Sequence, residues 1–200
     1  VEDYAAAADL LADAPPEVVA VEVNLPCPNV ESRNSMFAHS AAATTEAMAA
    51  TAGCGRPRWA KLSPNVTDLP SIAAAARDGG AEAVTLINTV MGLLLDPDTR
   101  RARLGNGGGG LSGPAIHPVA VRAVFECHAA HPDLPIVGVG GVARGADAAE
   151  LLLAGASAVQ VGTATFADPR APARVLEELA RWARTQPEPR ITDVLGGAHD

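Results

Sequence analysis

The stretch Pro135-Ile136-Val137-Gly138-Val139-Gly140-Gly141 is a short apolar run that ends in two glycines. A second run, Ala158-Val159-Gln160-Val161, ends in the same way at Gly162-Thr163. Short continuous apolar runs are typical of parallel strands with both faces covered. Glycine turns after the last two strands favour a (β/α)8 barrel, because a doubly wound sheet usually carries its glycine-rich turn after the first strand.

Upstream of these two strands, the chain alternates between apolar runs and amphipathic segments. Further strands are expected over residues 18–23, 59–63 and 83–87, and helices over 4–13, from Ser40 to Gly53, after Asp68, from Pro118, around Leu151 and around Leu179. Strict alternation predicts parallel strands joined by right-handed crossovers. Residues 91–115 are rich in glycine and are expected to be irregular.

The helix from Pro118 is expected to pack through one apolar stripe. Val121, Val124, Phe125 and His128 stand at the i, i+3, i+4 and i+7 positions of that stripe. His128 is therefore interpreted as a packed or surface residue of a helix rather than a ligand.

The 200 residues contain about five expected strands, whereas a complete barrel has eight strands in about 250 residues. If the last two are strands seven and eight, the chain starts just before strand four. We therefore expect residues 1–200 to form a single domain that is the C-terminal part of a (β/α)8 barrel, with the N-terminal strands missing. Such a piece would leave two strand edges open.

Composition excludes several functional classes. The net charge of -8 argues against nucleic-acid binding, which needs a basic face. No apolar run is long enough for a membrane helix, and the acidic N-terminal residues do not resemble a signal peptide. Three unpaired cysteines fit a cytoplasmic protein and give no metal-binding pattern. Cys54 and Cys127 are interpreted as structural.

The two glycine turns form the first candidate site. Glycine lets a ligand approach the backbone, and loops after strands seven and eight of a barrel often bind phosphate. A plain strand-to-helix turn would explain either pair alone. Two such turns in adjacent units favour a phosphate cradle that contains Gly140, Gly141, Gly162 and Thr163.

Lys61 stands in an expected strand between Ala60 and Leu62. A buried lysine needs a partner or an anionic ligand, whereas a lysine at a strand end can simply reach water. If a flavin phosphate occupies the glycine turns, Lys61 is expected near the pyrimidine edge of the flavin, where it would stabilise the negative charge that reduction places at N1 and O2.

Cys27 lies in a polar turn between two prolines, directly after an apolar strand. Free cysteine is usually buried and inert, but a stiff polar turn at a strand end makes Cys27 a candidate catalytic base. Because an ordinary thiol is mostly protonated at neutral pH, its activity should rise with pH. Asn24, Asn29 and Asn88 follow strands or turns and suit a ring that alternates C=O and N–H groups, although each alone could be a turn former.

Six stretches together resemble the soluble, cysteine-dependent class 1 of dihydroorotate dehydrogenases. They are Asn24-Leu25-Pro26-Cys27-Pro28-Asn29-Val30, Lys61-Leu62-Ser63-Pro64-Asn65-Val66-Thr67, Leu86-Ile87-Asn88-Thr89, Gly109-Gly110-Leu111-Ser112-Gly113-Pro114-Ala115-Ile116, Gly138-Val139-Gly140-Gly141-Val142 and Val159-Gln160-Val161-Gly162-Thr163-Ala164. The resemblance covers nearly all of the chain.

The resemblance implies FMN as cofactor, oxidation of dihydroorotate to orotate, and a role in pyrimidine (UMP) biosynthesis. It implies that Cys27 removes the C5 proton, and that residues 28–39 form a loop closing over the substrate. The substrate-binding residues implied are Asn24, Asn29, Asn88 and Thr89, and the FMN-binding residues are Asn24, Lys61, Ile87, Gly113, Val139, Gly140, Gly141, Gly162 and Thr163.

The resemblance is greatest to the subtype that pairs with an iron–sulfur/FAD subunit and passes electrons to NAD, which implies a homodimer or heterotetramer. The chain departs from the family pattern at Pro26, where the family usually has serine, and at His117, where a lysine is common. Rival hypotheses are another FMN barrel oxidoreductase such as a dihydropyrimidine dehydrogenase, a non-redox phosphate-binding barrel isomerase or lyase, and a non-catalytic fragment.

Overall fold

The computed structural model describes residues 1–26, 37–188 and 190–199. One sheet of five parallel strands organises the chain, with the strand order β1-β2-β3-β8-β9. These strands are β1 (Val21–Asn24), β2 (Arg58–Lys61), β3 (Ala83–Leu86), β8 (Ile136–Gly138) and β9 (Ala158–Val159). The prediction of an α/β fold with five parallel strands in chain order, as in part of a (β/α)8 barrel, is confirmed.

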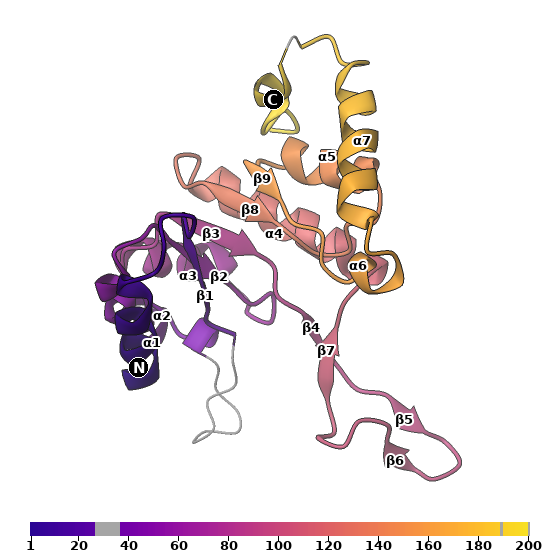
Figure 1. Cartoon of the computed structure of the whole chain (residues 1–200). Helices are drawn as coiled ribbons and strands as arrows, with labels where there is room; N and C mark the ends of the chain where they lie inside the picture. Colours follow the sequence, from indigo (N-terminus) through magenta and orange to yellow (C-terminus); the bar gives the residue numbers. More distant parts are fainter. Residues whose placement is uncertain (27–36, 189, 200) are drawn as a thin grey trace.

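Helices alternate with these strands (Figure 1). They are α1 (Glu2–Ala12), α2 (Ala41–Ala50), α3 (Leu69–Asp78), α4 (His117–Ala130), α5 (Gly145–Leu153), the short α6 (Ala164–Ala167), which the sequence did not predict, and α7 (Ala171–Ala183). The side chains of Ser40 and Asp68 cap α2 and α3, as is usual for N-cap residues. Predicted and observed ends differ by a few residues.

The hydrophobic core lies between one face of the sheet and the helices. Alternate strand residues such as Val23 of β1, Ala60 of β2 and Val84 of β3 belong to it, together with Met48 of α2 and Leu151 of α5. Side chains alternate along a strand, so the neighbouring residues occupy the opposite face. We call that opposite face the inner face and define it by Glu22, Asn24, Lys61 and Thr85.

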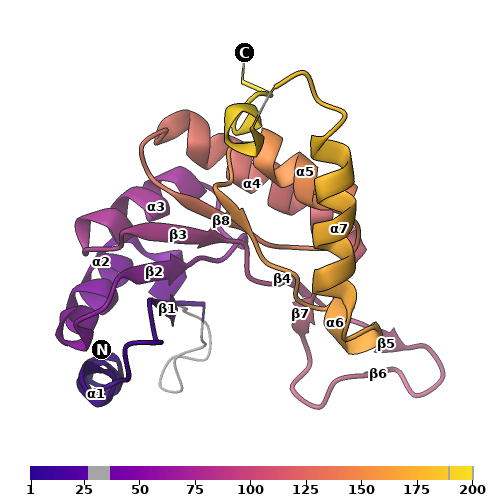
Figure 2. The same cartoon turned by 45° about the horizontal axis from the view of Figure 1, so that its top comes forward.

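A long arm leaves the sheet between β3 and α4 (Figures 1 and 2). It holds two antiparallel pairs, β4 (Val90–Gly92) with β7 (Gly109–Leu111) and β5 (Leu95–Asp96) with β6 (Arg101–Ala102). The expectation that residues 91–115 are irregular is therefore wrong. Strands of two or three residues, partly made of glycine, are too short to show an alternating pattern.

The buried face of α4 also differs from the prediction. Its buried residues are His117, Ala120, Ala123, Val124 and Cys127, while Phe125 is 38% exposed. Small side chains let this helix lie close to the sheet. The larger apolar residues Val121 and Phe125 mark a different stripe in the sequence from the alanine-lined face that is buried.

Candidate functional site

The carboxyl ends of β2, β3, β8 and β9 meet around one cavity of about 440 Å³. Eight residues predicted to bind cofactor line it, namely Lys61, Ile87, Gly113, Val139, Gly140, Gly141, Gly162 and Thr163. Asn88 and Thr89, predicted to bind substrate, line it as well. The structure thus brings together ten of the residues that the sequence singled out, because parallel strands end at a common edge.

The glycines of the two turns are required for different reasons. A Cβ atom on Gly140 would lie 2.7 Å from the Cβ of Ala120, and both Gly140 and Gly141 have positive φ angles of 139° and 69°. A Cβ atom on Gly162 would meet no atom within 4 Å. Packing therefore demands glycine after β8, whereas at Gly162 the absent side chain leaves open space at the cavity.

The turns also offer hydrogen-bond donors. Within the described part of the chain, no acceptor receives the backbone N–H groups of Gly141, Gly162 or Thr163. Free N–H groups from two adjacent turns are a usual way to hold a phosphate group. The cavity therefore fits the phosphate of a nucleotide cofactor at this end.

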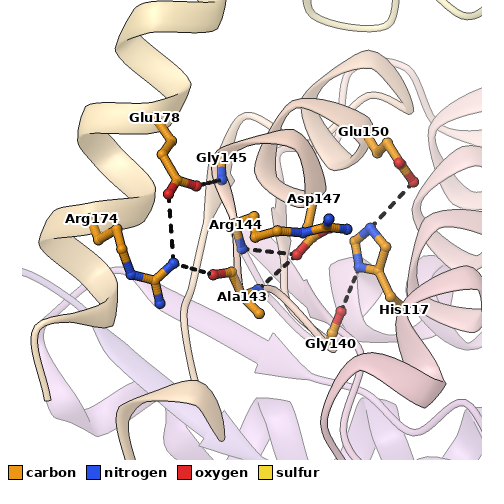
Figure 3. Close-up of polar contacts among 9 residues, drawn as sticks. All are labelled: His117, Gly140, Ala143, Arg144, Gly145, Asp147, Glu150, Arg174 and Glu178. Atoms are coloured by element: carbon orange, nitrogen blue, oxygen red, sulfur yellow. Dashed lines mark hydrogen bonds and ion pairs between the residues drawn. The ribbon is translucent and has the colours of Figure 1, made fainter. Parts of the chain in front are cut away.

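The turn after β8 is fixed by side chains from two helices (Figure 3). Asp147 of α5 accepts hydrogen bonds from the N–H groups of Ala143 and Arg144, both at 2.9 Å. From α7, Glu178 accepts the Gly145 N–H at 2.7 Å and Arg174 donates to the Ala143 carbonyl at 2.9 Å. Arg174 lines the cavity too. This turn is therefore held in shape by residues that the sequence analysis had not singled out.

The pKa of Asp147 is lowered. Burial alone would raise the pKa, but the hydrogen bonds from Ala143 and Arg144 and the charges of His117 and Arg144 together outweigh burial. Asp147 therefore stays ionised while it caps α5.

His117, at the start of α4, supports the same turn from the other side (Figure 3). Its Nδ1 lies 2.8 Å from the Gly140 carbonyl oxygen, and its Nε2 lies 3.3 Å from Oε2 of Glu150 without the geometry of a hydrogen bond. The ring is buried behind the glycines. His117, which stands where a lysine is common in the family that the sequence resembles, therefore contacts the turn after β8.

Lys61 is largely buried on the inner face, with 14% of its side chain exposed, and it lines the cavity. Its Nζ lies 3.6 Å from Oε1 of Glu22. The sequence predicted that Lys61 needs a partner or an anionic ligand, and the structure supplies a carboxylate partner while leaving the lysine at the cavity wall.

Asn24 and Asn88 lie together at the strand ends. The Nδ2 group of Asn88 donates to Oδ1 of Asn24 at 3.0 Å, although Asn24 does not line the cavity. Asn65 holds the neighbouring segment, since its side chain donates to the Thr89 carbonyl and accepts the Met91 N–H. The signal for Asn65 was its place directly after Pro64, at a strand end.

Two of the three cysteines lie among the described residues. Cys27 and Asn29, with residues 28–36 of the expected loop, lie outside the described residues, whereas Pro26 is buried in a turn. Cys54 and Cys127 are buried. Burial, with the nearby charges of Glu126 and Asp68, raises the pKa of the Cys127 thiol to about 12. The described residues contain no cluster of three metal-ligating side chains.

The chain matches the family model described as dihydroorotate dehydrogenase over residues 1–182. The chain belongs to the dihydroorotate dehydrogenase family. This match bears out the resemblance stated from the six sequence stretches, and the parallel sheet with its cavity at the carboxyl ends is the corresponding barrel architecture.

Several dihydroorotate dehydrogenases resemble this chain closely. A protein of Solibacter usitatus (strain Ellin6076), named as a type A (fumarate) dihydroorotate dehydrogenase, is 44% identical over 98% of this chain. The proteins of Desulforudis audaxviator (strain MP104C) and Pelobacter propionicus (strain DSM 2379 / NBRC 103807 / OttBd1), each named "Dihydroorotate dehydrogenase B (NAD(+)), catalytic subunit", are 44% and 43% identical over 100% and 98% of it. In each case the chain spans 64% of the relative's length.

Among the described residues, no helix combines the length and apolar character needed to cross a membrane.

Proposed function

We propose that this chain is part of an FMN-dependent dihydroorotate dehydrogenase that oxidises (S)-dihydroorotate to orotate in UMP biosynthesis. The observation that carries this proposal is the cavity that gathers eight of the nine expected FMN-binding residues beside Asn88 and Thr89. The family match supports the reaction. We regard residues 1–200 as belonging to a single FMN-binding (β/α)8-barrel domain.

In the proposed site, the N–H groups of Gly141, Gly162 and Thr163 would hold the phosphate of FMN. Their lack of an acceptor within the described residues supports this role. Gly113, Val139 and Ile87 would line the ring, and Lys61 would face its pyrimidine edge. FMN, when bound, accepts a hydride from the substrate. Binding of the substrate and removal of its proton would fall to side chains of the protein.

The amide groups hold the substrate in this proposal. Asn24, Asn29, Asn88 and Thr89 would bind the pyrimidine ring, since amides donate and accept hydrogen bonds as its C=O and N–H groups require. The bond between Asn88 and Asn24 leaves the second Asn88 N–H for a ligand. Cys27 would remove the proton from C5 as C6 loses its hydride, so that no charge accumulates on the substrate.

The partner subunit is also a proposal. Relatives named as catalytic subunits of an NAD(+)-linked enzyme support a partner subunit, which we propose carries iron–sulfur and FAD groups, and the relative named for fumarate marks the alternative acceptor. Leu93, Leu94 and Leu95 are 58–66% exposed along the arm, which supports assembly into a homodimer or heterotetramer. We place the enzyme in the cytoplasm.

The proposed function is tested by purifying the full-length protein and recording its absorption spectrum. Yellow flavin bands, FMN on release, and loss of these bands on anaerobic addition of dihydroorotate are expected. A protein that never contains FMN after reconstitution contradicts the redox proposal. A protein that binds FMN but is reduced by another dihydropyrimidine and not by dihydroorotate contradicts the substrate alone.

A further inference from the structure

Glu22 is surrounded by polar side chains from three other strand regions. Its Oε2 accepts hydrogen bonds from Oγ1 of Thr85 at 2.6 Å and from Nε2 of Gln160 at 2.9 Å. Its Oε1 lies 3.6 Å from Nζ of Lys61. These four residues come from β1, β2, β3 and the segment after β9, so one carboxylate connects most of the inner face.

This arrangement fixes the carboxylate more firmly than an ordinary ion pair does. Thr85 is fully buried, and its hydroxyl and the Gln160 amide hold one carboxylate oxygen while the other faces the lysine. Side-chain freedom is what usually weakens an exposed ion pair. Here the two hydrogen bonds position the Glu22 carboxylate, so that Lys61 faces a carboxylate held in one place.

Lys61 lines the cavity, whereas Glu22 does not. Among the residues that line the cavity, Lys61 is the one that Glu22 pairs with, so Lys61 is where the charge of Glu22 acts at shortest range. The negative charge of Glu22 offsets part of the positive charge that the lysine presents to the cavity, and the contact also limits how far the ammonium group can move toward a ligand.

We propose that Glu22 is a positioning residue that sets the place and the effective charge of Lys61 against the pyrimidine edge of the flavin. The inference rests on the proposed function, because it needs FMN in the cavity. The proposed task of Glu22 is to position Lys61, and it is distinct from substrate binding. Thr85 and Gln160 hold Glu22 in place for that task.

The test compares Glu22→Gln with the parent in the full-length, FMN-loaded protein. Glutamine keeps the shape of the side chain and can still accept from Thr85, but it removes the charge beside Lys61. The midpoint potential of the bound flavin should become more positive. The dissociation constant of oxidised FMN, divided by that of reduced FMN, should rise roughly two- to fivefold, which is the size of a partly screened charge interaction. Glu22→Asp, which withdraws the carboxylate by one methylene, should shift both quantities in the same direction by less.

The matched control is Glu126→Gln, which removes the same charge from the surface of α4, where Glu126 pairs with Arg122. It should leave the potential unchanged, and an equal shift in this control overturns the inference. If the Glu22 variants only lose thermal stability while the potential and the ratio of dissociation constants stay constant, Glu22 is merely structural and the inference fails. Should Glu22→Gln not fold, Glu22→Asp decides alone. A parent protein without FMN overturns the proposed function as well.

Discussion

At the residue scale, Gly140 and Gly162 belong to the turns after two adjacent strands but should tolerate a side chain differently. Gly140→Ala should lower the free energy of unfolding by about 1–3 kcal/mol, because the new methyl group meets Ala120 and the backbone has positive φ. Gly162→Ala should leave stability unchanged and weaken FMN binding about tenfold or more, because its methyl group occupies cavity space. Denaturant unfolding and FMN fluorescence quenching measure the two effects. Similar stability loss in both variants would contradict this distinction.

Cys27 carries the second prediction at this scale. Cys27→Ser should slow flavin reduction by dihydroorotate by about two to four orders of magnitude, since a serine hydroxyl ionises far less readily than a thiol near neutral pH, while orotate binding changes little. Anaerobic stopped-flow reduction and orotate titration separate the two effects. Cys127→Ala is the matched control, because the Cys127 thiol, with its pKa raised to about 12, is buried in α4 outside the cavity. Equal reduction rates in Cys27→Ser and the parent would remove Cys27 from the mechanism.

At the scale of the elements, the N-terminus of α5 depends on Asp147. Asp147→Ala should lower the free energy of unfolding by about 1 kcal/mol at neutral pH, since two backbone N–H groups lose their acceptor. The pKa of Asp147 is lowered in the folded protein, so this contribution is complete above about pH 4 and is lost as the pH falls below that value. Urea unfolding of the variant and the parent from pH 7 to pH 3 should show the difference shrinking with acid. The exposed Asp133 gives the control, Asp133→Ala.

The C-terminal segment packs on α4 through aromatic rings, since His199 stacks on Phe125 with ring centroids 3.9 Å apart and contacts His128 at 4.9 Å. Burial, together with the charge of His199, lowers the pKa of His128. The unfolded chain then binds the proton more tightly, so stability falls as the pH drops below about 6.5. Hydrogen exchange of residues 195–199, corrected for intrinsic rates, should show less protection at pH 5.5 than at pH 7.5. His128→Gln should reduce this dependence, and equal protection in the parent would contradict it.

How far the sequence could predict these elements depends on the range of the contacts. The strands and their carboxyl ends were predictable because apolar runs and terminal glycines are local signals, and parallel pairing then gathers residues such as Lys61 and Gly162 at one edge. The role of Glu22 has no local signal, because its partner Gln160 is distant in sequence. Asn65 has a local signal in its place after Pro64, but its contact with Thr89 does not, for the same reason. The face of α4 was misjudged because alanines such as Ala120 line it.

At the scale of the whole molecule, the arm extends away from the sheet and exposes leucines at its outer part (Figure 2). If the arm mediates the proposed assembly, replacing Leu93 and Leu94 together by aspartate should reduce the molar mass measured by light scattering, because a charged residue is costly to bury at an interface. Leu10→Asp is the control, since Leu10 is 84% exposed on α1. An unchanged mass in the double variant would exclude this part of the arm from the interface.

The hydrogen bond between Glu22 and Gln160 joins residues 138 positions apart in the chain. A ribosome that adds about 5–20 residues per second needs roughly 7 to 28 seconds to make the intervening segment. For that interval the nascent chain holds Glu22 without its amide donor, and the sheet is still without its last strand. The contact between Glu22 and Gln160 therefore forms only after residue 160 has been made, and slowing synthesis before that residue should prolong the time in which the unfinished sheet is open to chaperones and to misfolding.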